Sequence, residues 1–225
     1  MELKIIYEDN HIIVVRKPVN IPSQGDKTGD KDMISIIKEY LIKKYNKPGD
    51  AYLGLVHRLD RPTGGVMVFA KTSKAAARLS EQIRDKKFEK EYLCIVDGKM
   101  ESDEGIFEDY LLKNEKNNLS KVVNPKVKNS KLAKLQYMVI KYNKEINLSL
   151  VKVKLLTGRH HQIRVQFSSR NHSLYGDQKY GTRGRGKQLC LWAYKISFIH
   201  PTTKEKLEFE DYPDPIGSWI ILEDN

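Results

Sequence analysis

The sequence predicts an α+β fold around a mainly antiparallel sheet. Two long segments of alternating apolar residues, 131–142 and 146–156, flank a short polar turn, which is typical of an antiparallel hairpin. Other β-branched segments and two or three helical segments accompany them, without the regular βαβα alternation of a parallel sheet. Thr63-Gly64-Gly65 lacks the lysine and the spacing of a phosphate loop, which excludes an NTPase.

The first third of the chain predicts three strands and two helices. The strands are expected over residues 5–7, 12–15 and 66–71, and the helices over residues 33–45 and 73–86. Lys17-Pro18 ends the second strand because proline cannot donate to a β-ladder. Asp32 is the expected N-cap of the first helix, and the Gly- and Asp-rich residues 22–31 predict an exposed loop before it.

The rest of the chain predicts more strands and one short helix. The strands are expected over residues 88–96, 131–142, 146–156 and 189–198, and the helix over residues 161–170. Residues 100–129 are polar and lysine rich and indicate no regular element. Cys94 and Cys190 lie in apolar runs outside any CxxC motif, so we expect buried packing residues rather than a disulfide or zinc ligands.

Composition and charge narrow the class of protein. The 225 residues fit one large domain or one domain of two fused halves, and we expect a single domain over residues 1–225. Lys and Arg outnumber Asp and Glu by 40 to 29, which favours a polyanionic partner, although a basic proteome produces the same excess. We find no signal peptide and no segment that could span a bilayer, so we expect a cytoplasmic protein without membrane association.

Residues 57–66 are the first candidate site. Asp60 lies between Arg58 and Arg61 in a turn with a proline and two glycines, directly before an apolar strand. A turn beside a rigid sheet can expose a catalytic group and still hold it in place. The flanking cations favour the ionised carboxylate that a nucleophile or a base requires. A surface salt bridge at a turn is the alternative interpretation.

Residues 156–164 are the second candidate site. With Thr157 as the N-cap of a helix, the free amides of the next turn and Arg159 suit a phosphate or a carboxylate. His160 and His161 are adjacent and do not share a helical face, so we do not expect them to bind zinc. The alternative interpretation is a capped helix with a solvated charged face.

Together the two segments resemble the RluA-type family of pseudouridine synthases. The family signature His-Arg-Leu-Asp-x-x-Thr-Ser-Gly is matched by residues 57–65, with Gly64 in place of the serine. Further segments resemble family motifs in the same order, at residues 6–9, 14–18, 88–92, 156–164, 176–181 and 191–201. The resemblance covers Ile5 to Tyr212, although Gln166 and Trp192 stand where the family often has histidine.

The resemblance implies a fold and an RNA-modifying activity. The fold is a mainly antiparallel mixed sheet of two fused halves, with flanking helices and RNA-clamping loops, and without a separate N-terminal RNA-binding module. The activity is the isomerisation of uridine to pseudouridine, with the target base flipped out of its stack. Asp60 is the implied catalytic carboxylate, Tyr92 stacks on the uracil, and Arg164 pairs with Asp60. No cofactor or metal is implied, and the choice between a covalent adduct and ribose proton abstraction stays open.

The expected partner is structured ribosomal or transfer RNA, in particular a compact stem-loop, bound by a monomer. The expected RNA-binding residues are His57, Arg58, Arg61, Arg159, His161, Gln162, Lys179, Arg183 and Arg185. The loops over 26–31, 114–131 and 180–187 are expected to hold the RNA backbone, although each also fits an ordinary solvated loop. A silent RNA-binding protein, another RNA enzyme and a basic protein-interaction domain are the competing classes.

Overall fold

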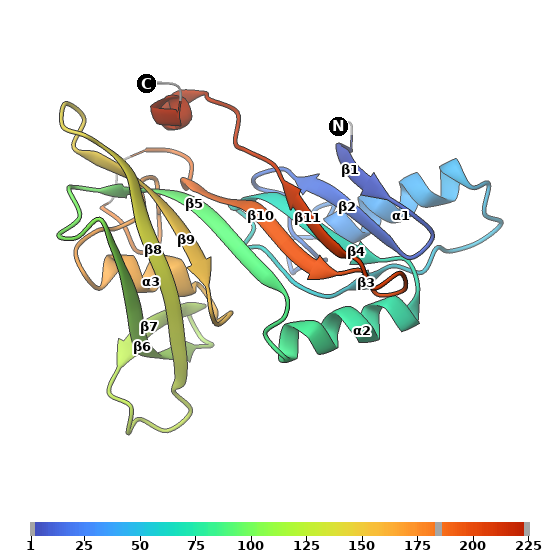
Figure 1. Ribbon diagram of the computed structural model, residues 1–225, viewed down its shortest axis with the longest axis horizontal. Coiled ribbons are helices and arrows are strands. Elements are labelled where there is room, and N and C mark those ends of the chain that lie inside the picture. Colours follow the sequence, from blue (N-terminus) through green and yellow to red (C-terminus); the bar gives the residue numbers. More distant parts are fainter. Residues whose placement is uncertain (1–2, 183–185, 223–225) are drawn as a thin grey trace. The chain divides into compact units, whose positions relative to one another are not determined.

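Two strands are shared by the two compact units of the structure. The computed structural model describes residues 3–182 and 186–222. Unit 1 comprises Met1–Lys90 and Ala193–Tyr212, and unit 2 comprises Glu91–Trp192 and Pro213–Asn225. The chain leaves unit 1 within strand β5 (Glu89–Asp97) and returns to it within strand β10 (Leu191–Ile199). Figure 1 labels both strands.

Unit 1 is a sheet with strand order β1-β2-β4-β10, in which β3 pairs with β4 and β11 pairs with β10. Its other strands are β1 (Ile5–Glu8), β2 (Ile12–Lys17), β3 (Gly54–Leu55), β4 (Gly64–Ala70) and β11 (Lys206–Glu210). The ladders β1–β2, β2–β4, β3–β4 and β10–β11 are antiparallel. The turn between β3 and β4 carries the first candidate site.

Two helices of unit 1 begin at side-chain caps. Asp32 accepts a hydrogen bond from the Ser35 amide at 3.1 Å, and helix α1 (Met33–Lys44) follows. Thr72 accepts one from the Ala75 amide at 3.2 Å before helix α2 (Ser73–Arg84). Helix α2 buries its apolar face in a core that includes two stacked phenylalanine rings, of Phe88 and Phe198, with centroids 5.2 Å apart. Helix α2 therefore covers the sheet with the apolar face that the spacing of its residues predicts.

Gly65 allows two strand backbones of unit 1 to approach closely. It follows the candidate site directly, has φ +122°, and pairs with Lys17 of β2. A Cβ atom at this position would lie 2.2 Å from the carbonyl oxygen of Ala193 in β10. Only glycine combines this backbone conformation with this approach. The sequence thus places β4 against β10 immediately after the turn.

Unit 2 is a second antiparallel sheet with strand order β5-β9-β8-β6-β7. Its further elements are β6 (Glu104–Asn114), β7 (Leu119–Val123), β8 (Lys131–Asn143), β9 (Leu148–Leu155), helix α3 (Gln162–Ser168) and the 3-10 helix η1 (Gly217–Leu222). Phe167 of α3 packs against the rings of Phe107 and Tyr137, with centroids 5.0 and 6.0 Å away. Helix α3 therefore covers the face of the sheet that these aromatic residues share.

The predicted α+β fold with a mainly antiparallel sheet is confirmed, and one region was wrongly predicted. The polar residues 100–129 contain strands β6 and β7, and the expected loop over 114–131 therefore includes a strand. In β6 only Phe107 and Leu111 are buried. Because so few of its positions need an apolar side chain, the segment lacks the alternation of apolar and polar residues that predicts a strand. Strand β11 and helix η1 were not predicted either.

The helices within residues 3–182 and 186–222 include none that is both long enough and apolar enough to cross a membrane.

Substitution of Gly65 by alanine is expected to lower the free energy of unfolding strongly. The methyl group would overlap the backbone of Ala193, and the left-handed conformation alone costs an L-residue about 1–2 kcal/mol. Gly29→Ala is the matched control, because Gly29 also has positive φ (+72°) but its Cβ would meet no atom within 4 Å. Urea unfolding should give a loss at least about 2 kcal/mol larger for Gly65→Ala. Equal losses would mean that the approach of β4 and β10 does not constrain this residue.

Candidate functional site

The turn that carries Asp60 is fixed through its peptide groups. Thr63 donates its amide to the Asp60 carbonyl at 2.9 Å and closes the turn. Leu59 points into the core and is 7% exposed, whereas Asp60 is half-buried and Arg58 is exposed. Alternation of buried and exposed side chains along the turn thus leaves Asp60 at the boundary between the interior and solvent.

A fully buried lysine lies beneath this turn. Lys17, the last residue of β2, is 0% exposed, and its ammonium donates to the carbonyls of Pro18 and Arg61 at 2.9 and 3.1 Å. Burial lowers the pKa of Lys17 to about 7, against the opposing effect of the Asp60 charge, while Arg61 lowers it further. An amine that is only partly protonated at neutral pH therefore interacts with the Asp60 charge and is itself bonded to the turn.

Arg61 is engaged by the loop that follows β2. Its Nε donates to the Asn20 carbonyl at 3.1 Å, and its Nη1 donates to the Thr28 hydroxyl at 3.1 Å. Its Nη2 is paired with the Asp30 carboxylate, and its Nη1 lies 3.8 Å from the Asp26 carboxylate. The loop over residues 26–31, expected to be basic toward RNA, thus presents two carboxylates to Arg61.

His57 supports the turn from the interior. It is 8% exposed, and its Nε2 accepts the amide of Val68 at 3.1 Å, directly beyond the short ladder that β3 forms with β4. Burial, and to a lesser extent the charge of Lys90, lower the pKa of His57 to about 3. Burial also lowers the pKa of Lys90 itself. The imidazole is therefore neutral at physiological pH, and contact of His57 with RNA stays a prediction.

In unit 2, Arg164 forms a buried ion pair with Asp177. Its Nε and Nη2 each donate to an Asp177 carboxylate oxygen at 2.7 Å, and the two side chains are 4% and 0% exposed. Burial alone would raise the pKa of Asp177, but the bonds and the charge of Arg164 hold it below its usual value. Asp60 belongs to unit 1, so the pairing of Arg164 with Asp60 stays a prediction.

The expected N-cap role of Thr157 is wrong. Helix α3 begins after His161, which has φ +53° and forms no side-chain cap. The Thr157 hydroxyl instead accepts the Lys134 amide at 2.8 Å and donates to Gln162 Oε1 at 2.7 Å. Because Gln162 Oε1 also accepts the Arg159 amide at 3.0 Å, this side chain takes the amide that we expected to face a ligand.

The histidines after Thr157 belong to a polar network of unit 2. Their rings stack with centroids 3.7 Å apart. His160 Nδ1 lies 2.9 Å from the Ser120 hydroxyl, and His161 Nδ1 lies 2.7 Å from the Tyr180 hydroxyl. Tyr180 also lies against the guanidinium of Arg164, with the ring centroid 5.2 Å from its Cζ. The network thus connects the buried ion pair with the half-buried His160.

The remaining predicted residues are spread over unit 2. Tyr92 of β5 is 6% exposed, opposite Val153 in the ladder with β9. Arg159 is exposed and bonds the Leu132 carbonyl at 2.8 Å, and Lys179 bonds the Asn118 carbonyl at 3.2 Å. Arg183 and Arg185 lie outside the described residues.

The sequence predicted no catalytic or binding role for Lys17, Ser23 or Asp177. A lysine at the end of an apolar strand was a usable signal for Lys17, since an isolated charge there needs a specific partner. Asp177 lies in the family-like segment 176–181 and could have been found as an acidic partner for Arg164. Ser23 carried no signal, because a single serine after a proline is typical of any loop.

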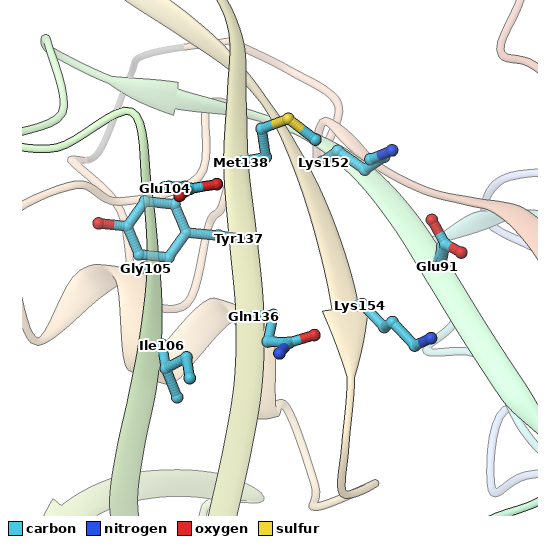
Figure 2. A pocket seen from close by; sticks show the side chains of 9 residues that line it. All are labelled: Glu91, Glu104, Gly105, Ile106, Gln136, Tyr137, Met138, Lys152 and Lys154. Atoms are coloured by element: carbon cyan, nitrogen blue, oxygen red, sulfur yellow. The ribbon is translucent and has the colours of Figure 1, made fainter.

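A groove of about 640 Å³ lies on the sheet of unit 2, and its lining includes none of the predicted site residues (Figure 2). It is lined by Glu91, Glu104, Gly105, Ile106, Gln136, Tyr137, Met138, Lys152 and Lys154. Basic and acidic side chains balance there, which does not favour a polyanion. Within the described part of the chain, no group of three or more His, Cys, Asp or Glu side chains is arranged to hold a metal ion.

Comparison with known proteins identifies the family. Residues 11–169 match the family described as RNA pseudouridylate synthase. The chain belongs to this family. An "Uncharacterized RNA pseudouridine synthase" of Aquifex aeolicus is 34% identical over 97% of this chain and 73% of its own length. A "Ribosomal large subunit pseudouridine synthase C" of Haemophilus influenzae is 33% identical over 93% of this chain and 65% of its own length.

The fold of this RNA pseudouridine synthase agrees with that of solved structures. Human RNA Pseudouridylate Synthase Domain Containing 4 superposes with a TM-score of 0.79 over 96% of this chain and 90% of that chain, at 21% identity. The family match and the relatives described above confirm the resemblance to the RluA-type family, and the protein is an isomerase that acts on RNA.

The stability of the synthase is expected to fall in acid because of His57. The pKa of His57 is about 3 in the folded state against an ordinary value of 6.5, so the unfolded chain binds more protons between these values. The free energy of unfolding should therefore decrease as pH falls below about 6.5, by up to about 1.4 kcal/mol per pH unit from this group. His57→Asn keeps an acceptor for Val68 and should show a shallower pH dependence in urea unfolding. Parallel curves would contradict the assignment.

Removal of the charge of Asp177 is expected to destabilise the synthase strongly. Asp177→Asn breaks one partner of a buried ion pair, which typically costs about 3–5 kcal/mol. Asp50→Asn is the control, because Asp50 is paired with Lys38 at 2.6 Å on the surface and such pairs contribute about 0–1 kcal/mol. Urea unfolding compares the two variants. A loss for Asp177→Asn as small as that for Asp50→Asn would mean that the pair contributes no net stability.

Proposed function

We propose that this synthase converts uridine in ribosomal RNA to pseudouridine with Asp60 as its catalytic carboxylate. The observation that carries the proposal is the turn at residues 59–63, which is bonded through its peptide groups and presents Asp60 half-buried beside the ammonium of Lys17. A group that acts on a reacting atom has to be both accessible and held in place. The matching signature at residues 57–65 places the same residue at the position of the family's aspartate.

Catalytic roles are also proposed for Tyr92 and Arg164, which the family resemblance implies. Tyr92 would stack on the uracil, as its place in the family-like segment 88–92 implies. Arg164 would pair with the Asp60 carboxylate. Its place in the family-like segment 156–164 implies this role.

The chemistry requires that the uridine leave its base stack. The bond from C1′ of the ribose to N1 of the uracil breaks, the base turns, and a bond from C1′ to C5 forms. The proton on C5 is then lost to solvent, and N1 gains a proton.

Arg58 is exposed two residues before Asp60, so we assign it to the space that the flipped nucleotide vacates.

Ribosomal RNA is the proposed substrate because a relative 33% identical to this chain is named for the large ribosomal subunit. The formal charge of +11 is consistent with a polyanionic substrate. We propose that a monomer recognises a compact stem-loop, with Arg159 and Lys179 among the side chains that contact the backbone. Transfer RNA is the alternative substrate that the experiment has to distinguish.

Tritium release from uridine C5 tests the proposal. The purified protein is incubated with transcripts of ribosomal and transfer RNA that carry tritium at C5, and the released tritium is counted. Wild type should release tritium from a ribosomal fragment, and Asp60→Asn should reduce the rate by about 10³-fold or more, since this change keeps size and removes the charge. Asp50→Asn, an exposed carboxylate of unit 1 paired with Lys38, should keep the wild-type rate.

Three other outcomes of the tritium-release assay would contradict the proposal. Release by both wild type and Asp60→Asn would remove Asp60 from the catalytic role. Release from transfer RNA alone would replace the proposed substrate. Bound but unmodified RNA would favour a protein that binds RNA without catalysis.

A further inference from the structure

Ser23 forms hydrogen bonds with both peptide groups of the residue before Asp60. It lies in the segment between β2 and α1 and is 5% exposed. Its hydroxyl accepts the amide of Leu59 at 3.1 Å and donates to the carbonyl of Leu59 at 2.8 Å. One side chain thus satisfies the donor and the acceptor of Leu59, as a neighbouring strand would. This contact joins residues 36 positions apart in the chain.

The residue after Asp60 is bonded to the same segment. The ammonium of Lys17 donates to the carbonyl of Arg61 at 3.1 Å, and the Arg61 guanidinium donates to the carbonyl of Asn20 at 3.1 Å. Residues 17–23 therefore bond both neighbours of Asp60 in the chain, Leu59 and Arg61. These bonds use peptide groups or the Arg61 side chain and leave the Asp60 carboxylate to its own contacts.

Loss of the Ser23 hydroxyl would leave two buried groups without their partner. Leu59 is itself 7% exposed, so water reaches its amide and carbonyl poorly. A buried polar group without a partner favours any rearrangement that finds one. Rotation of the Leu59 peptide is the smallest such rearrangement, and it would redirect the Cα–Cβ bond of Asp60.

We infer that Ser23 is a positioning residue of the pseudouridine synthase reaction, which acts by fixing the peptide that orients Asp60. The inference rests on the proposed role of Asp60. A catalytic carboxylate displaced by about 1 Å loses about 10²-fold in rate, whereas RNA binding over many contacts is little affected. Ser23 should therefore contribute to kcat and not to RNA affinity.

Ser149 provides a matched control for a purely structural role. It is 0% exposed and donates its hydroxyl to the Gly98 carbonyl at 2.7 Å within unit 2. Ser149→Ala removes one buried hydroxyl of the same kind, within the ladder of β9 with β5 in unit 2. Similar losses of thermal stability are expected for Ser23→Ala and Ser149→Ala.

The test measures kcat and KM by tritium release from the substrate fragment, the RNA dissociation constant by filter binding, and the melting temperature. Ser23→Ala should lower kcat by about 10- to 100-fold, with KM and the dissociation constant near wild type. Ser149→Ala should keep the wild-type kcat. Ser23→Thr retains a hydroxyl and should recover most of kcat.

A double mutant keeps the test informative if Ser23→Thr does not fold. Asp60→Glu already moves the carboxylate by one methylene, so addition of Ser23→Ala should lower the remaining rate by much less than it lowers the wild-type rate. Full additivity would mean that Ser23 does not act through Asp60 and would overturn the inference.

Three further results would also overturn it. They are a wild-type kcat for Ser23→Ala, an equal loss of kcat for Ser149→Ala, and a rise of KM at constant kcat. Asp60→Asn in the same assay distinguishes failure of the positioning role of Ser23 from failure of the catalytic role of Asp60. If Asp60→Asn is inactive and Ser23→Ala is fully active, only the positioning role fails. If Asp60→Asn is active, the proposed function fails, and the positioning role fails with it.

Discussion

The buried ammonium of Lys17 is the interaction on which the geometry of the Asp60 turn depends. A charged group with 0% exposure is costly to desolvate, and peptide carbonyls of Pro18 and Arg61 offset part of this cost. The antiparallel register of β2 and β4 places Lys17 opposite Gly65, at the end of the turn. The position of the turn is therefore set by the strand ladder and by the hydrogen bonds of the Lys17 amine to the carbonyls of Pro18 and Arg61.

In unit 2, buried polar side chains form hydrogen bonds with one another instead of with isolated peptide carbonyls. Asp177 accepts bonds from Arg164 and from the amides of Lys179 and Tyr180, and the Tyr180 hydroxyl contacts both His161 and the Ser120 amide. Buried polar groups are tolerated when they are paired in this way. The network includes His161, the residue before α3, which forms no side-chain cap on this helix.

The fold class and most elements could be predicted because local patterns decide them. The cap at Asp32, the hairpin of β8 and β9, and the end of β2 before Pro18 depend on neighbours in sequence. Strand β6 could not be predicted, since its partners β7 and β8 stabilise a segment with few buried residues.

In the candidate site, too, features decided by local sequence could be predicted and features decided by tertiary contacts could not. Asp60 and Arg164 were accessible through motif resemblance, whereas Ser23 and the Thr157–Gln162 bond depend on contacts across tens of residues or on a left-handed turn at His161. A sequence pattern therefore pointed to the proposed catalytic residues more readily than to the residues that bond their surroundings.

The pairing of Arg61 with two carboxylates has a consequence for the salt dependence of RNA binding. A cation that leaves Asp26 and Asp30 for a phosphate exchanges one anion for another. Lys195, between Glu208 and Glu210, and Lys71, on Glu8, are neutralised internally in the same way. The number of counterions released from RNA is set by the phosphate contacts that form. The formal charge of +11 therefore does not measure how steeply affinity declines with ionic strength.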